Sequence, residues 1–414
     1  MGDLFFMGII LNSGQERIRQ LAVDWYHNSS EQIFEIEGPA GSGKSVLIYE
    51  ILKSLKLPTY SVMPMAYTGQ ASIVMRTRGF TNARSIHSSL YDSVEYYDTN
   101  DINNKFGAPI KKKEFRLRND LDPRVDLFFI DEAFMVPNYM KKDICSFGKK
   151  ILVAGDSHQL PPIGDKPGFL TGYGIHRLTE LMRQAADNPI IYIADRVMKG
   201  LPIHAGVYGN QVLVVNDTEF IPEMIAFADC ICCGTNRTRE SMNRYVRQLA
   251  GFAHSQVPIV GERIICRNNN WNISQNGIAL TNGLSGTVMS YPDAGSFDGS
   301  VFRLDFLPDL VNSCFQNVPI NYEYFVADFD EKQRIKDQIK KWSVGELFEF
   351  AYALTTHLCQ GAEYDNGIYI EEFMRPQIQN QLNYTGVTRF KKRLIYVKKT
   401  NKYIYIPNTN KIFN

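Results

Sequence analysis

The chain has 414 residues, of which 44% are hydrophobic and 21% are charged, so it has the composition of a globular protein large enough for more than one domain. Its formal net charge of +1 excludes a protein that attracts polyanions through its overall field, so any such surface must be local. The seven cysteines are an odd number without a C-x-x-C pair. They predict buried thiols in a reducing compartment rather than a zinc site.

The apolar segment FFMGIIL near the N-terminus is the first element to interpret. It is too short to span a membrane, and no basic residues precede it as they would in a signal peptide. We therefore expect a soluble, cytoplasmic protein without a membrane partner.

Residues 32–55 predict a strand, a glycine-rich loop and a helix. QIFEIEG (32–38) alternates like a strand, and VLIYEILKSL (46–55) has leucine and isoleucine at helical spacing. GPAGSGKS (38–45) lies between them and fits the pattern G-x-x-x-x-G-K-[ST], whose backbone N–H groups surround the phosphates of a nucleotide. With both flanks in the required order, the sequence predicts a nucleoside triphosphate site.

Each residue type in this loop has a physical role. Lys44 is predicted to neutralise the β and γ phosphates, and Ser45 to hold Mg²⁺ through its hydroxyl. The helix that follows would direct its positive end at the anion. Glycine lets the backbone turn inward without a side chain in the way, at Gly38, Gly41 and Gly43.

Further apolar runs alternate with helical stretches and predict an α/β fold of parallel sheets buried on both faces. We place two such domains at residues 1–185 and 186–414. Two segments interrupt the alternation: residues 91–124 predict a small β-hairpin insertion in the first domain, and residues 289–345 a partly β insertion in the second. Either insertion could be functional or a solvated decoration.

Two polar segments follow strand-like runs downstream of the glycine-rich loop. FFIDEA ends an apolar run with Asp131 and Glu132, of which the first can orient hydrated Mg²⁺ and the second can accept a proton from an attacking water. GDSHQLPPIGD presents Gln159, whose uncharged amide suits the sensing of a γ phosphate. An Asp-Glu pair after a strand is more often a helix cap, but its position after a phosphate loop favours catalysis.

GPAGSGKS, FFIDEA and GDSHQLPP, in this order, resemble motifs I (Walker A), II and III of superfamily 1 helicases. LNSGQERI resembles their Q motif, which implies that Gln15 contacts adenine. MAYTGQAS and ARSIHSSL resemble the motifs with which the first domain binds a single strand, and they implicate Thr68 and His87.

Further motifs follow along the chain. LTELMRQA resembles motif IV and NYTGVTRFKKRLIYV resembles motif VI, which implies catalytic roles for Arg183 and for Arg389, the arginine finger. ALTTHLCQGAEYD resembles motif V, which implies two residues facing DNA and two near the nucleotide: Thr355 and His357, then Gln360 and Gly361.

The whole set is similar to the Dda and RecD-like branch of the superfamily, a phage-type group that moves 5′ to 3′. The resemblance implies two tandem RecA-like P-loop domains, a strand-separating pin at 91–124 and an SH3-like accessory domain at 289–345. It implies an ATP hydrolase that requires Mg²⁺ and unwinds DNA. Its partners would be single-stranded DNA, forked duplex DNA, and single-strand-binding or replication proteins.

The same resemblance implies a monomer that works in phage replication, recombination or repair, in the cytoplasm of the host. Two alternatives stay open. One is an ATP-dependent single-strand translocase or remodelling protein without robust unwinding, which would share every ATPase residue. The other is an RNA-directed viral helicase, because stacking and phosphate contacts select poorly between DNA and RNA.

Overall fold

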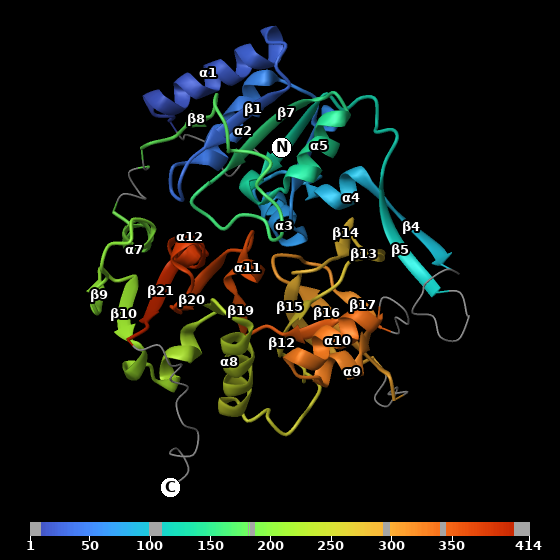
Figure 1. Ribbon diagram of the computed structural model, residues 1–414, viewed down its shortest axis with the longest axis vertical. Coiled ribbons are helices and arrows are strands. Elements are labelled where there is room, and N and C mark those ends of the chain that lie inside the picture. The colour runs from blue at the N-terminus through green and yellow to red at the C-terminus, as the bar shows by residue number, and fades with distance from the viewer. Residues whose placement is uncertain are drawn as a thin grey trace. The chain divides into compact units, whose positions relative to one another are not determined.

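The computed structural model describes residues 10–98, 110–180, 182, 187–292, 299–339 and 345–400. The chain forms two compact units. Unit 1 consists of Met1–Ser157, Pro161–Met182 and Val260–Glu349, and unit 2 of His158–Leu160, Arg183–Ile259 and Phe350–Asn414. Figure 1 shows the elements of each unit. No helix among the described residues is long and apolar enough to cross a membrane.

The first sheet of unit 1 is parallel throughout, with the strand order β3-β2-β6-β7-β1-β8. Its strands are β1 (Ile33–Glu37), β2 (Val62–Ala66), β3 (Arg84–Ser85), β6 (Leu127–Asp131), β7 (Lys150–Gly155) and β8 (His176–Arg177). The helices that connect or flank them are α1 (Ser13–Asn28), α2 (Lys44–Leu55), α3 (Gly69–Thr77), α4 (Ile86–Leu90) and α5 (Asn138–Ser146).

Both faces of this sheet are buried, as the continuous apolar runs predicted. Along β6, Leu127 and Phe129 join the core under α1 and α2, whereas Phe128 and Ile130 join the core under α4 and α5. This alternation follows from the two-residue period of a strand. The predicted motifs lie where the chain leaves the carboxyl ends of these strands.

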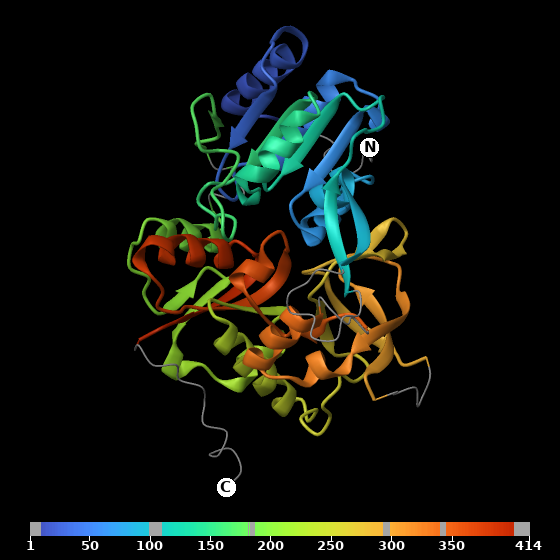
Figure 2. The same cartoon turned by 45° about the vertical axis from the view of Figure 1, so that its right-hand side comes forward.

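The predicted β-hairpin insertion is present in unit 1 as β4 (Tyr91–Asp98) and β5 (Ile110–Leu117). The two strands pair antiparallel from Tyr91 opposite Leu117 to Asp98 opposite Ile110. Figure 2 shows this ribbon extending away from the parallel sheet. The residues that join the two strands, 99–109, lie outside the described residues.

A second, five-stranded sheet of unit 1 has the order β17-β16-β15-β12-β18 and is antiparallel from β12 to β17. It comprises β12 (Arg263–Cys266), β15 (Ser285–Ser290), β16 (Val301–Pro308), β17 (Phe315–Asn321) and β18 (Phe348–Phe350), with α9 (Tyr322–Val326) and α10 (Phe329–Ile339) after β17. The hairpin of β13 (Asn270–Gln275) and β14 (Ile278–Leu280) lies between β12 and β15. The sheet thus begins before residue 289, where the insertion was predicted to start, and it is part of unit 1 rather than unit 2.

Unit 2 contains the other parallel sheet, with the order β19-β11-β20-β21-β10-β9. Only β9, at one edge, runs antiparallel to its neighbour. The elements are α7 (Pro189–Met198), β9 (Gly206–Tyr208), β10 (Val212–Asn216), β11 (Cys230–Cys233), α8 (Asn236–Leu249), β19 (Ala353–Thr355), α11 (Thr356–Cys359), β20 (Tyr364–Ile370), α12 (Pro376–Val387) and β21 (Phe390–Lys398).

Two parallel α/β sheets with smaller insertions confirm the predicted fold class. The prediction that the cysteines of β11 are buried is also confirmed, since Cys230, Cys232 and Cys233 are almost fully covered. Within the described ranges, no three His, Cys, Asp or Glu residues are grouped so that they could hold a metal ion.

Candidate functional site

The glycine-rich loop of unit 1 joins β1 to α2 and needs its glycines. Gly41 and Gly43 have φ angles of 81° and 80°, in the left-handed region that other residues rarely adopt. A Cβ atom on Gly38 would lie 2.5 Å from the Ser42 hydroxyl oxygen. The loop therefore keeps the tight, side-chain-free path that a phosphate cradle requires.

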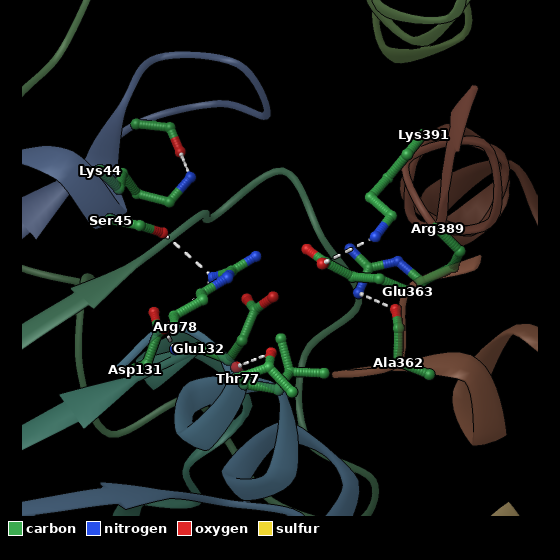
Figure 3. Close-up of polar contacts among 12 residues, drawn as sticks. Lys44, Ser45, Thr77, Arg78, Asp131, Glu132, Ala362, Glu363, Arg389 and Lys391 are labelled. Carbon is green, nitrogen blue, oxygen red and sulfur yellow. Dashed lines mark hydrogen bonds and ion pairs between the residues drawn. The ribbon is translucent and has the colours of Figure 1, made fainter. Parts of the chain in front are cut away.

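Lys44, the first residue of α2, folds back on the loop. Its Nζ donates hydrogen bonds to the backbone oxygens of Gly38, at 2.5 Å, and Pro39, at 3.1 Å (Figure 3). The ammonium group is thus held over the loop by neutral carbonyls. Phosphate oxygens of a bound nucleotide would be stronger partners for this group, because they carry negative charge.

Gln15 is fully buried on α1 and connects that helix to the loop. Its side-chain oxygen accepts from the N–H of Asn12 to complete a capping box, while its Nε2 donates to the backbone oxygen of Ser42 at 3.1 Å. The same Nε2 lies 3.3 Å from the Met182 sulfur. The predicted adenine contact of Gln15 stays a prediction, but its support of the loop is a second role that the sequence did not reveal.

Asp131 ends β6, and Glu132 follows it in a left-handed conformation with φ 51°. Residues other than glycine rarely take this backbone conformation, so the turn stores strain of the kind found at functional sites. The Asp131 Oδ1 accepts a hydrogen bond from the Glu132 N–H at 2.9 Å and so stabilises the turn.

Arg78, which sequence reasoning missed, lies between the two predicted magnesium ligands. Its Nη1 donates to the Ser45 hydroxyl at 3.0 Å and lies 3.7 Å from the Asp131 Oδ2 (Figure 3). A hydroxyl and a carboxylate that converge on one cation form the hard oxygen set that Mg²⁺ prefers. The residues present thus fit a magnesium ion, with the guanidinium standing in for it.

Three of the predicted site residues of unit 2, Gln159, Gln360 and Gly361, are buried. The segment of Gln159 packs within unit 2, where the N–H of Leu160 donates to the Thr385 hydroxyl at 2.9 Å. Gln360, predicted to lie near the nucleotide, donates its Nε2 to the backbone oxygen of Leu160 at 3.0 Å. Gly361 follows with φ 79°, a conformation that favours glycine.

Arg389, the predicted arginine finger, is 4% exposed and is held by α12, just before β21. Its Nε donates to the backbone oxygen of Thr385 at 3.0 Å and its Nη2 to the Thr388 hydroxyl at 3.2 Å. Its Nη1 lies 3.5 Å from the backbone oxygen of Ala362 (Figure 3). These bonds preorganise the guanidinium within unit 2. Arg183, the other predicted catalytic arginine, lies outside the described residues.

The two motif V residues predicted to face DNA differ in environment. Thr355 is buried at the start of α11. His357 is half-buried on that helix, and burial lowers the pKa of its imidazole. A lower pKa favours the neutral ring, which can donate a hydrogen bond or stack.

Glu372, a further buried group of unit 2, organises the start of α8. One carboxylate oxygen accepts from the N–H groups of Gly234, at 2.6 Å, and Thr235, at 2.7 Å. The other accepts from the hydroxyls of Thr235, at 2.9 Å, and Thr238, at 2.5 Å. A carboxylate at this helix end satisfies free N–H groups and complements the helix dipole.

We expect Glu372→Ala to lower the free energy of unfolding of unit 2 by about 3 kcal/mol, because four buried donors would lose their acceptor. Glu372→Gln should cost less, since its amide group can donate to the two hydroxyls while its oxygen still accepts. Urea unfolding followed by circular dichroism measures both variants. Equal, negligible losses would show that the network does not hold the helix.

A basic pocket of about 270 Å³ lies in unit 1 between α3, the start of α4 and the β13–β14 hairpin. Three arginines line it, together with serine and threonine hydroxyls, glycines and one tryptophan; no acidic residue does. The lining residues are Gly69, Ser72, Arg76, Arg84, Ser85, Ser88, Arg118, Trp271, Ser274, Gly277, Ile278, Ala279 and Thr281. Burial, and then the nearby charge of Arg84, lower the pKa of Arg76. This surface suits a chain of phosphates with bases to stack.

The predicted strand-binding residues of unit 1 adjoin this pocket. Thr68 caps α3, since its hydroxyl oxygen accepts from the N–H of Ala71 at 3.1 Å. His87 is half-buried on α4, and burial lowers the pKa of its ring. A row of aromatic rings continues from it: His87 to Phe115 of β5 at 5.8 Å between ring centroids, then Phe115 to Trp271 of β13 at 4.7 Å.

The sequence motifs predicted only the side of this pocket that α3 and α4 form. The β13–β14 hairpin, which carries Trp271, forms the other side, and no local sequence pattern predicts that it lies there. The basic run MRTRGFTNAR, which contains Arg76, Arg78 and Arg84, is the sequence feature that could have indicated a basic surface.

The chain resembles known proteins in sequence and in fold. A family model described as an AAA domain matches residues 11–214. The ATP-dependent RecD2 DNA helicase of Deinococcus radiodurans is 28% identical in an alignment 291 residues long, which covers 66% of this chain and 37% of that protein. This chain thus spans little more than a third of its curated relative.

Solved structures extend the likeness to nearly the whole chain. Bacteroides Pif1 helicase in complex with ADP-AlF3 and single-stranded DNA is 16% identical, with a TM-score of 0.53 and coverage of 98% of this chain and 96% of that one. A structure concerning DNA unwinding at forked double-stranded DNA by two coordinating Pif1 helicases has a TM-score of 0.54 at 16% identity and the same coverage.

The phosphate loop and the two parallel sheets define this protein as a P-loop α/β protein with a RecA-like core. More particularly, its fold resembles that of the solved Pif1 helicase structures, and its sequence is similar to that of an ATP-dependent DNA helicase.

Proposed function

We propose that this protein is an ATP-dependent DNA helicase that hydrolyses ATP to move along single-stranded DNA and unwind duplex DNA. The observation that carries the proposal is the convergence of Lys44, Ser45 and Asp131 beside a phosphate loop, in a unit that also holds a basic pocket free of acidic residues. Such a unit combines a phosphate site with a surface for a nucleic-acid strand.

Each group of the phosphate site has a defined task in hydrolysis. Lys44 would exchange its backbone carbonyls for phosphate oxygens, and Glu132 would accept the proton of the attacking water. Ser45 and Asp131 would hold Mg²⁺, which supplies positive charge to the phosphates when bound. Gln159 would sense the γ phosphate, and Arg183 and Arg389 would stabilise the charge that develops in the transition state.

The finer proposals rest on the motif resemblance. They are translocation from 5′ to 3′, membership of the Dda and RecD-like branch, a role in phage DNA replication, recombination or repair, and work as a cytoplasmic monomer. Likewise, the β4–β5 ribbon would be the separating pin, and the 289–345 segment part of an accessory domain. Tailed duplexes test the direction: unwinding from a 3′ tail alone would refute it.

The test of the function itself is the ATP hydrolysis rate with no nucleic acid, with single-stranded DNA and with single-stranded RNA. We expect DNA to stimulate hydrolysis and a forked duplex to be separated. Stimulation of hydrolysis without strand separation would show that the protein is a translocase and not a helicase. Stimulation by RNA alone would show that its substrate is RNA and not DNA. An unstimulated rate would refute a nucleic-acid motor.

The basic pocket makes a separate prediction. Arg84→Ala should weaken binding of a dT oligonucleotide about fivefold at low salt and reduce the slope of log affinity against log salt by about 0.7, the loss of one phosphate contact. Fluorescence anisotropy across a salt series measures both quantities. Arg124→Ala is the matched control, because Arg124 is exposed and pairs with Asp122 outside the pocket. A variant slope equal to that of the wild type would show that the pocket binds no phosphate.

A further inference from the structure

The end of α3 connects the two sites of unit 1. Arg78 directly follows this helix, and its backbone N–H points to the carbonyl oxygens of the last turn, including that of Met75 at 3.1 Å. Its guanidinium is therefore carried by the helix end while it contacts Ser45 and Asp131. These contacts tie the end of α3 to Ser45 and Asp131.

Arg76 leaves the same turn towards the basic pocket. Its Nη2 donates to the backbone oxygen of Gly277 at 2.9 Å and its Nη1 to that of Asn276 at 3.4 Å, so it holds the tip of the β13–β14 hairpin. Its Nε donates to the backbone oxygen of Ala83 at 2.7 Å. One helical turn thus sends one arginine to the metal ligands and another to the hairpin that forms a wall of the pocket.

The position that Arg78 takes is also the one that a magnesium ion needs. Two cations within a few ångströms of each other repel, and the Ser45 hydroxyl oxygen cannot face both at full strength. The Arg78 side chain is 30% exposed, so it has a route into solvent. Magnesium binding therefore requires Arg78 to move away.

We propose that Arg78 is a built-in competitor of Mg²⁺ and that its displacement by magnesium nucleotide is transmitted through the last turn of α3 to Arg76 and the β13–β14 hairpin. This proposal rests on the nucleotide site of the proposed function. In the nucleotide-free protein the guanidinium neutralises Asp131 and keeps the helix end in place. When Mg²⁺ arrives with a nucleotide, the helix end is released and the hold of Arg76 on the hairpin changes.

The first experiment measures Mn²⁺ binding to the nucleotide-free, full-length protein by electron paramagnetic resonance. Arg78→Gln removes the competing charge and should bind Mn²⁺ at least about tenfold more tightly than the wild type, a difference of about 1.4 kcal/mol. Arg78→Lys keeps the charge and should stay near the wild type. Arg124→Gln is the control for loss of one surface arginine. Equal or weaker Mn²⁺ binding by Arg78→Gln would overturn the proposal.

ADP binding in the presence of Mg²⁺ separates this inference from the proposed function. The wild type should bind ADP, and Arg78→Gln should bind it at least as tightly. If the variant binds magnesium ADP more weakly, Arg78 is a phosphate ligand, and the proposal that it competes with Mg²⁺ is refuted. If the wild type itself does not bind ADP, the nucleotide site fails, and the proposed function fails with it.

The second experiment tests the relay. The affinity for a labelled dT oligonucleotide is measured with and without magnesium ADP, and the ratio is the coupling factor between the two sites. We expect a coupling factor different from one in the wild type and in Arg124→Gln, and a factor close to one in Arg78→Gln. The same factor in all three proteins would overturn the relay.

Discussion

Replacing Lys44 with alanine is expected to reduce ATP turnover by roughly a hundredfold or more, because the loop would lose the ammonium group that faces the phosphates. In the structure this ammonium group rests on the carbonyls of Gly38 and Pro39, so it is already held over the loop. Alanine removes the charge but keeps good helix propensity at the first position of α2. The fold should therefore survive the change.

The measurement is the steady-state release of phosphate at saturating ATP, with and without single-stranded DNA. Lys53→Ala, on the same helix but 62% exposed and paired with Glu50, is the matched control and should keep the wild-type rate. Normal turnover by Lys44→Ala would mean that GPAGSGKS is not the catalytic phosphate loop.

Arg389→Ala is expected to lower the maximal hydrolysis rate by about a thousandfold, the usual contribution of an arginine finger. Binding of ATP should change much less, because the lost charge matters most in the transition state. The three bonds from the guanidinium to Thr385, Thr388 and Ala362 hold it in a fixed orientation, so the effect depends on geometry as well as charge. Arg389→Lys should therefore restore only a small part of the rate.

Because Arg389 is buried, its loss also affects the stability of unit 2, and thermal unfolding must be measured beside the kinetics. The informative readout is the comparison of the affinity for ATP with the rate of a single turnover. A slow turnover with unchanged affinity and a folded protein supports the finger. An unchanged single-turnover rate would show that Arg389 does not stabilise the transition state and that its role is structural.

The nucleotide half of the candidate site could be predicted from sequence because its chemistry is local. Lys44 and Ser45 follow three glycines of one loop, and left-handed backbone angles at Gly41 and Gly43 are a property of those residues themselves. The apolar runs predicted the two parallel sheets for a similar reason, since strands buried on both faces need continuous hydrophobic sequence. Asp131 and Glu132 were placed by the rule that ligands bind at the carboxyl ends of such strands.

The rest was decided by contacts between segments distant in sequence. Arg76 meets the tip of a hairpin about 200 residues further along the chain, and this contact helps to form the basic pocket. Trp271 packs against Phe115 for the same reason, although neither lies in a motif that identifies it. The extent of the five-stranded sheet followed from the pairing of strands, which the turn-rich sequence around residue 289 did not reveal.

Arg78 shows most clearly which features the sequence predicts and which depend on the tertiary structure. Sequence predicted that Ser45 and Asp131 would hold Mg²⁺ beside a nucleotide, because residue types and spacing indicate that chemistry. Only the tertiary structure decided that an arginine from the end of α3 stands between these two ligands. The physical reason is that a motif specifies the groups bonded to its own backbone, whereas the charge that competes for them is brought by folding from another helix.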